Sequence, residues 1–452
     1  MQATMLWFLW QSLLQPFQPA FTAKGFRNFG EWVTGLVLNV EEHTITQSLI
    51  ALERPQDWKA LESFAELGTW RQDILADRLA QLLDDAPGSL WFGYHVSALD
   101  DTKVHRNSAN VWGTCTFHEY TARCPNRATT VRAHNWVVLG RLLQYPDHPA
   151  WFLPHTGRLY FRRSQLPTKP VSEPFQTKCE LAVDLLQKHA ASLPQERHLA
   201  VFDGGYAFAS VVEPLVRPPA ESGHKRIDFL TRLRHDARLC ALLPPEEDGQ
   251  KQQGRPRKWG KPLPPPRRGG KWPGKWQEGK AFIYSRVRKV RWKEIICQWR
   301  VLGHETAVKA VVAEVEGYSE RFCLVSSALD LTGLQMVELF AARFRQEDGF
   351  RDLKQRLGWE ECRAWTRLPI LRTTQALFCA MSLMRLLQFL LDKQEQQDAW
   401  WRAPPWNPKK DRPSVLDAQR MFRRHAQEFR QLLSEWVTDG KKGVGETARM
   451  DC

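Results

Sequence analysis

The stretch FAARFRQEDGFRDLK, residues 340–354, has the spacing of an amphipathic helix, but charged residues occupy one of its faces. Five residues follow one another at intervals of three or four and therefore share one stripe of a helix: Phe340, Arg343, Glu347, Phe350 and Lys354. A stripe that only packs against a core is apolar throughout. Here two aromatic residues alternate with two cations and a carboxylate.

The limits of this helix follow from its flanking residues. Thr332 followed by Gln335 is the pattern of a capping box, and Gly358 is a typical C-terminal stop, which predicts a helix from about 333 to 357. Two interpretations of the charged stripe are open. On a solvated face an i,i+4 ion pair contributes only ~0.3–0.5 kcal/mol and leaves the alternation with aromatic residues unexplained. A half-buried carboxylate flanked by cations is instead typical of a site that handles metal ions and phosphates.

A hard divalent cation at Glu347 needs further carboxylates from elsewhere in the fold. The run LAVFDGGYAF (199–208) places Asp203 at the end of an apolar strand, and HVSALDDTKVH (95–105) places Asp100 and Asp101 after another. Each of these aspartates can also be an ordinary turn residue. Taken together, acidic residues at strand ends and one on a helix can converge at one point of a sheet, which favours a metal site.

The pattern of the whole chain indicates a mixed α/β protein. Residues 1–88 contain successive amphipathic helices, and APGS at 86–89 interrupts them. Strand-like runs follow, then a helix at 176–193 and a short buried strand at 198–205. Strands followed by strand–helix alternation are typical of an α/β domain. Further strand-like runs lie between 281 and 327, and helices are expected from there to the end.

The positive charge of the chain is concentrated in one segment. The 452 residues carry a net charge of +14, and residues 251–300 alone contain 16 basic and 2 acidic residues, an excess of the same size. Residues 244–280 are also rich in Pro, Gly and Trp, a composition that does not form a core of its own. Such a segment suits contact with a DNA backbone, and its tryptophans can either stack on unpaired bases or pack locally.

Two other classes of protein are disfavoured. The nine cysteines include no CxxC pair and no zinc-ligand spacing, which indicates reduced cysteines rather than a disulfide or zinc scaffold. No run reaches the ~18 apolar residues expected of a membrane span.

Three motifs resemble those of a known enzyme family. The pattern F-x2-R-x3-E-x6-K at 340–354 resembles the Tyr-Arg-Glu-Lys signature of bacterial insertion-sequence transposases, whose DDE catalytic domain is RNase H-like. LDDTKV (99–104) is similar to the first acidic motif of that family, where a Thr follows the Asp, and VFDGGYA (201–207) is similar to the second. The Thr favours Asp101 over Asp100. Phe340 stands where the family has tyrosine, so a phenolic hydrogen bond to a DNA phosphate is lost.

The resemblance implies an α/β fold, namely an RNase H-like mixed-sheet core interrupted by a β-rich insertion, with helical regions at both ends. The long gap of 144 residues between Asp203 and Glu347 matches members with such an insertion. The N-terminal helical region, expected to bind DNA ends, covers 1–88, and the first part of the core covers 89–215. The basic insertion, with a flexible loop at 244–280, covers 216–328. The helical second part of the core covers 329–395, and a C-terminal helix and tail cover 396–452.

The resemblance also implies roles for individual residues. Asp101, Asp203 and Glu347 are expected to be catalytic and to hold two Mg²⁺ ions, with Mn²⁺ able to substitute. Phe340, Arg343 and Lys354 of the charged stripe are expected to contact DNA. Arg255, Arg257 and Lys258 are expected to do so as well; they lie in GRPRKWG (254–260), which resembles a minor-groove AT-hook segment.

The implied function is cleavage at the ends of an insertion sequence and strand transfer into target DNA. The implied partners are the terminal inverted repeats, target DNA and a second copy of the chain, in the bacterial cytoplasm and at the nucleoid, with no membrane. Two alternatives stay open: a catalytically inactive DNA-binding regulator derived from a transposase, and a Mg²⁺-dependent nuclease without strand transfer.

Overall fold

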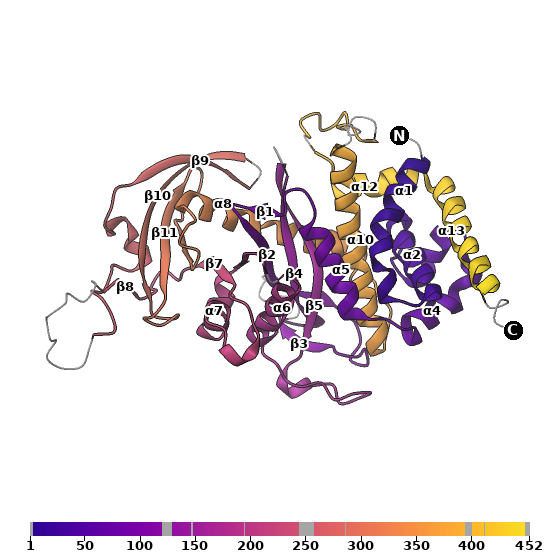
Figure 1. The fold of residues 1–452 in the computed structure, drawn as a ribbon, viewed down its shortest axis with the longest axis horizontal. Helices are drawn as coiled ribbons and strands as arrows, with labels where there is room; N and C mark the ends of the chain where they lie inside the picture. The colour runs from indigo at the N-terminus through magenta and orange to yellow at the C-terminus, as the bar shows by residue number, and fades with distance from the viewer. Residues whose placement is uncertain are drawn as a thin grey trace.

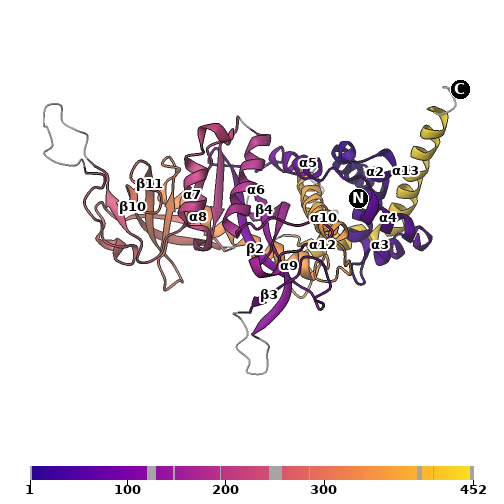
Figure 2. The same cartoon turned by 90° about the horizontal axis from the view of Figure 1, so that it is seen from below.

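The computed structural model describes residues 3–119, 129–145, 148–193, 195–243, 257–284, 286–393, 400–410 and 412–447. A mixed β-sheet runs through the centre of the molecule, with a β-rich extension at one end and a bundle of helices at the other (Figure 1). The view turned by 90° shows the same order along the molecule (Figure 2).

Five strands of the sheet form the mixed-sheet core expected from the sequence. Strands β2, β4 and β5 are antiparallel neighbours, and β6 and β7 continue the sheet beyond β2 as parallel strands. The resulting order, β5-β4-β2-β6-β7, is that of the RNase H-like fold and confirms the predicted fold class. The strands are β2 Tyr94–His105, β4 Thr130–Tyr145, β5 His148–Tyr160, β6 His198–Phe202 and β7 Asp228–Arg232.

Two helices cross between the parallel strands on one face of this sheet. Helix α6 (Lys178–Ser192) begins at a capping box, in which Thr177 accepts a hydrogen bond from the amide of Glu180 and the Glu180 carboxylate accepts one from the amide of Thr177. Helix α7 (Ala209–Val216) follows β6. Their apolar side chains pack with Leu99 and Phe202 in one hydrophobic core. The small strands β1 (Leu90–Trp91) and β3 (Cys115–His118) pair with β2 and β4.

The insertion between β7 and the next helix extends the same sheet. Strand β12 pairs with β7, β11 with β12 and β10 with β11, and both β8 and β9 pair with β10. The first of the strand-like runs, AFIYSRVRKVRW (281–292), belongs to a hairpin of two strands, because the chain reverses at Tyr284, whose φ is 48°. The strands are β8 Leu239–Ala241, β9 Gln277–Ile283, β10 Arg286–Trp299, β11 Ala307–Val315 and β12 Phe322–Ser326.

Part of the Pro/Gly-rich segment packs onto this extension. Trp272 is 2% exposed, and its indole donates a hydrogen bond to the carbonyl of Pro264 at 2.8 Å. Lys293 Nζ donates to the carbonyl of Trp272 at 2.9 Å. The sequence predicts a flexible loop over 244–280, whereas residues 257–276 lie against the sheet because a buried tryptophan anchors them; the remainder, 244–256, lies outside the described residues.

The helices from the two ends of the chain pack together. They lie side by side at one end of the molecule (Figures 1 and 2), joined by edge-to-face aromatic pairs such as Trp10–Phe422 and Trp7–Phe429, with ring centroids 4.9 and 5.5 Å apart. The helices are α1 Ala3–Leu14, α2 Ala23–Leu38, α3 Ile45–Ala51, α4 Trp58–Leu67, α5 Gln72–Asp84, α10 Arg367–Lys393, α12 Val415–Arg424 and α13 Ala426–Thr447. Within the described residues, Arg367–Leu391 of α10 is long and apolar enough to cross a membrane, but 89% of the apolar window is buried inside the protein, as in a core helix.

Candidate active site

Two aspartates lie side by side where β2 and β6 run parallel. Leu99 of β2 is in register with Phe202 of β6, so the next residues along each strand are Asp100 and Asp203. Side chains alternate between the faces of a sheet. Because Leu99 and Phe202 point into the core beneath α6 and α7, both aspartates point to the opposite face. The Asp203 carboxylate accordingly helps to raise the pKa of Asp100.

The charged stripe lies on two helices above that face. Helix α8 (Gly333–Arg343) begins at the predicted capping box of Thr332 and Gln335. It ends at Phe344, whose amide bonds to the carbonyl three residues back, and α9 (Arg345–Gln355) follows directly. The sequence predicts a single helix over 333–357, whereas the structure has two. At Phe344 the tighter i→i−3 hydrogen bond replaces the i→i−4 hydrogen bond of a regular α-helix, and this separates α8 from α9.

Glu347 stands at the start of α9, close to the aspartates. Its side chain is exposed, whereas the sequence predicts a half-buried carboxylate. Although the side chain is exposed, the groups around it remove part of the hydration of its carboxylate, and this desolvation raises the pKa of Glu347; the Arg343 guanidinium opposes the rise, and Asp348 and Asp203 add to it. Glu347 is thus near both Arg343 and Asp203, at a position that an extended substrate such as DNA can reach.

Arg343 connects the helix to the strand. Its Nη1 lies 3.3 Å from Asp100 Oδ2, and its side chain is 10% exposed. The guanidinium also lies over the Phe340 ring, 5.4 Å from the centroid. Burial raises the pKa of Asp100 to about 6, against the opposing effect of Arg343. The structure therefore brings together one arginine and three carboxylates: Arg343, Asp100, Asp203 and Glu347.

Asp101 lies on the other face of the sheet. Its carboxylate accepts hydrogen bonds from Lys178 Nζ of α6 at 2.6 Å and from the Tyr206 hydroxyl at 3.1 Å. The Thr that follows Asp101 favours Asp101 in the sequence, but the alternation of side chains along β2 turns Asp101 away from Glu347 and brings Asp100 to the site. A signal for Asp100 was present: in both HVSALD and LAVFD, the aspartate directly follows the apolar run.

The other predicted DNA contacts are placed differently. Lys354 Nζ donates a hydrogen bond to the carbonyl of Lys103 on β2 at 2.6 Å and lies 3.9 Å from Glu360, so it is held against the strand, and burial lowers its pKa. Arg257 and Lys258 are exposed next to β8. Strand β8 is five strand spacings from β6 in the sheet, roughly 24 Å. Arg255 lies outside the described residues.

The tryptophans of the basic segment differ in accessibility. Trp272 and Trp292 are buried, with 2% and 6% of their surface exposed. Trp276 is partly exposed and lies beneath the Arg291 guanidinium, 4.7 Å from the ring centroid. Trp259 is likewise covered in part by Arg300. The two buried rings are not placed for base stacking.

The carboxylates suit a hard divalent cation. Within the part of the chain that the structure describes, no three His, Cys, Asp or Glu side chains already lie close enough to enclose an ion. The donor oxygens are nevertheless those that Mg²⁺ and Mn²⁺ prefer. Asp203 raises the pKa of both Asp100 and Glu347, a like-charge repulsion that a bound cation would relieve.

Comparison with protein families agrees with this fold. Residues 16–300, more than half of the chain, match the family described as DDE superfamily endonuclease. The match includes Asp100 and Asp203 and ends before α8 and α9, so it does not reach the Tyr-Arg-Glu-Lys-like stripe. A search of curated proteins found no match. Nuclease domains of this type act on DNA and generally use divalent metal ions. The chain therefore belongs to the DDE superfamily endonuclease family and is a transposase-like nuclease.

Proposed function

We propose that the protein is an insertion-sequence transposase whose catalytic carboxylates are Asp100, Asp203 and Glu347, with Asp100 in the role for which the sequence alone favours Asp101. One observation carries this proposal: Asp100 and Asp203 are neighbours on the face of the sheet where Arg343 and Glu347 lie. A regulator that only binds DNA has no use for three mutually repelling carboxylates beside a buried arginine.

The three carboxylates would hold two Mg²⁺ ions, with Mn²⁺ as a substitute. When bound, these ions would increase the nucleophilicity of a water or a DNA 3′-hydroxyl and stabilise the leaving 3′-oxygen. The protein's own contribution is to keep the ligands deprotonated and to position the DNA. Arg343 lowers the pKa of Asp100 towards the charged form that a cation requires.

Arg343 would also bind the DNA backbone near the scissile phosphate. Its guanidinium is held by the Phe340 ring and by Asp100, and 10% of the side chain remains exposed. A guanidinium fixed in this way can pair with a phosphate oxygen. Phe340 keeps the packing role of the family tyrosine without its hydroxyl.

The reaction is an in-line displacement at phosphorus. In the first step the oxygen of water attacks the phosphodiester at the element end; one P–O bond forms, the bond to the 3′-oxygen breaks, and a free 3′-hydroxyl results. In the second step the oxygen of that hydroxyl attacks a target phosphodiester: a new P–O bond joins element to target, the bond from phosphorus to the target's own 3′-oxygen breaks, and the target strand leaves with a free 3′-hydroxyl. Two ends must react together, so the proposed form is a homodimer on paired terminal repeats, acting on the bacterial nucleoid.

A cleavage assay on the element's own ends tests this function. The substrate is a linear duplex that carries the inverted repeats flanking the gene, incubated with Mg²⁺ or Mn²⁺ and either wild type or Glu347→Gln. We expect metal-dependent cuts at the end boundary by wild type and none by the variant. Cuts without joining of a pre-cleaved 3′-end to target DNA would indicate a nuclease without strand transfer. DNA binding without cleavage by wild type would indicate the regulator.

A further inference from the structure

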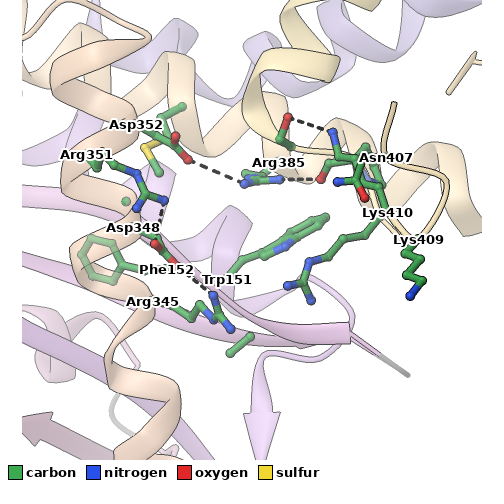
Figure 3. Close-up of a pocket in the computed structure, with 16 residues that line it drawn as sticks. Trp151, Phe152, Arg345, Asp348, Arg351, Asp352, Arg385, Asn407, Lys409 and Lys410 are labelled. Carbon is green, nitrogen blue, oxygen red and sulfur yellow. Dashed lines mark hydrogen bonds and ion pairs between the residues drawn. The ribbon is translucent and has the colours of Figure 1, made fainter. Parts of the chain in front are cut away.

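A polar cavity lies beside helix α9, away from the candidate active site. Its volume is about 430 Å³, and it is bounded by β5, α9, α10 and the segment that precedes α12 (Figure 3). In Figure 3 the side chains of α9 lie on one side and those of 407–410 on the other, with Trp151 and Arg385 between them. Asp348 lines this cavity, while its neighbour Glu347 belongs to the candidate active site.

The cavity is strongly basic. Its lining includes two acidic residues, Asp348 and Asp352, and six basic ones, which leaves an excess of four positive charges; the basic residues are Arg345, Arg351, Arg385, Lys409, Lys410 and Arg412. Asp348 is already shared between two of them, since Arg345 and Arg351 each donate to its carboxylate at 2.7 Å. Asp417, just outside the lining, forms an ion pair with Lys410, so this cation is already neutralised; among the described residues the lining still carries more cations than its own carboxylates and Asp417 together.

Arg385 shows the imbalance most clearly. Its side chain is only 11% exposed, yet the carboxylate of Asp352 is 3.9 Å away, too far for a hydrogen bond. The guanidinium is held in place by Gln388 Oε1 at 2.9 Å and by the Trp151 ring, whose centroid is 4.6 Å away. Burial lowers the pKa of Arg385 to about 10. The carboxylates of Asp352, Asp348 and Asp417 oppose this lowering from a distance, and an anion in direct contact with the guanidinium would stabilise its charge further.

We propose that this cavity binds phosphates of a DNA strand, next to the catalytic carboxylates and on the same helix. The inference rests on the proposed function. A helix with its side chains is ~10–12 Å across, so a strand with a rise of ~3.4 Å per nucleotide reaches from one site to the other in about three or four nucleotides. The lining offers cationic donors over a buried aromatic floor, since Trp151 is 7% exposed. Such a site reads backbone charge, not base identity.

The test is the salt dependence of DNA binding. Arg351 is 58% exposed and Lys409 is exposed, so Arg351→Gln with Lys409→Gln removes two charges from the cavity without disturbing a core. Both are made in a Glu347→Gln background to prevent cleavage. The matched control is Lys188→Gln on α6, on the opposite face of the sheet, where Lys188 is 60% exposed and makes only a 3.5 Å contact with Asp73. Thermal melting verifies that each variant is folded.

The probe is a duplex of arbitrary sequence, titrated between 50 and 200 mM salt. Each phosphate contact contributes about 0.9 to the slope of log affinity against log salt. We expect the slope to fall by about 1.8 in the double variant and to stay at the parent value in Lys188→Gln. An unchanged slope in the double variant, with normal binding by the parent, would overturn the cavity proposal and leave the active-site proposal standing. No DNA binding by the parent would overturn both.

A further arm separates DNA from free phosphate as the ligand. Inorganic phosphate replaces chloride at constant ionic strength during the binding measurement. We expect it to change parent and double variant equally. If low concentrations of phosphate reduce the parent's slope to that of the double variant, the cavity binds small anions and the assignment to DNA is wrong.

Discussion

Arg343 Nη1 lies 3.3 Å from Asp100 Oδ2, and this contact joins helix α8 to strand β2 across the candidate active site. Arg343 lowers the pKa of Asp100, while burial, Asp101 and Asp203 raise it. The arginine thus helps to keep the carboxylate charged, and in the proposed function it also binds the DNA backbone.

The first prediction concerns the charge of Arg343. Arg343→Gln removes the cation that opposes protonation of Asp100, so the acidic limb of the pH–rate profile should move to higher pH and cleavage should fall. Arg343→Lys keeps the charge but not the planar fork, so it should restore the acidic limb while binding phosphate less well. The measurement is initial cleavage rate against pH at fixed Mg²⁺. An identical acidic limb in all three proteins would contradict the role of the contact.

The second prediction concerns stability without metal. The pKa of Asp100 is raised from 3.8 to about 6 in the folded protein, so its charged form costs stability above pH 6 and costs nothing below pH 3.8. Two pKa units correspond to ~2–3 kcal/mol. Asp100→Asn should therefore unfold at a higher temperature than wild type at pH 8 with EDTA, and the difference should shrink towards pH 4. Thermal unfolding at both pH values measures it; a destabilised variant at pH 8 would contradict this account.

The third prediction concerns acid sensitivity at the junction of α5 with the sheet. Asp84 and Arg141 form a buried ion pair with Nη2 2.5 Å from Oδ1, and several buried histidines surround it: His95, His155, His189 and His198. Burial, together with the charge of Arg141, lowers the pKa of His155 to about 3. Because the unfolded chain takes up this proton near pH 6.5, stability should be complete above 6.5 and decline steadily below it.

Substitution of one histidine isolates this effect. His155→Gln should flatten the loss of unfolding free energy between pH 6.5 and 4.5, even if it lowers stability at pH 8. Exposed His105→Gln is the matched control and should keep the wild-type slope, since its side chain is 49% exposed. Denaturant unfolding at several pH values measures the slopes. Equal slopes for all three proteins would mean that the buried histidines do not set the acid response.

The fourth prediction concerns the link between the insertion and the catalytic helices. Glu294 of β10 accepts a hydrogen bond from the amide of Gly333, the first residue of α8, at 2.5 Å. A carboxylate at a helix N-terminus contributes ~0.5–2 kcal/mol. Glu294→Ala should therefore lower stability by about that amount and reduce cleavage without weakening DNA binding. Glu278→Ala, an exposed change on β9, is the control. Full cleavage activity in Glu294→Ala would show that the contact between the insertion and α8 is not needed to position α8 for cleavage.

The fold was predictable because its signals are local and periodic. The capping box at Thr332 and Gln335, the apolar run before Asp203 and the interruption after the N-terminal helices all correspond to observed boundaries. The break at Phe344 was not predictable, because residues 340–354 keep helical spacing through it. The burial of Trp272 could not be predicted from the sequence, because the residues around it have the Pro/Gly-rich composition of a loop and the surface that Trp272 packs on is formed only in the folded protein.

In the candidate site, too, one feature could not be predicted from the sequence because it depends on contacts between distant parts of the chain. The sequence predicts the acidic pair at the end of a strand, whereas both aspartates lie within β2, and which of the two faces α9 depends on the register of β2 with β6. That register is a contact between residues about 100 positions apart, Leu99 with Phe202. A shift by one residue would exchange the two side chains between the faces.

The most direct test of the account is therefore a comparison of Asp100→Asn with Asp101→Asn. Both proteins are assayed for Mg²⁺-dependent cleavage of a duplex carrying the element ends, next to wild type and Glu347→Gln. We predict that Asp100→Asn is as inactive as Glu347→Gln, and that Asp101→Asn retains activity within about tenfold of wild type, as expected for a residue that supports the site through Lys178 and Tyr206. An active Asp100→Asn together with an inactive Asp101→Asn would contradict the assignment.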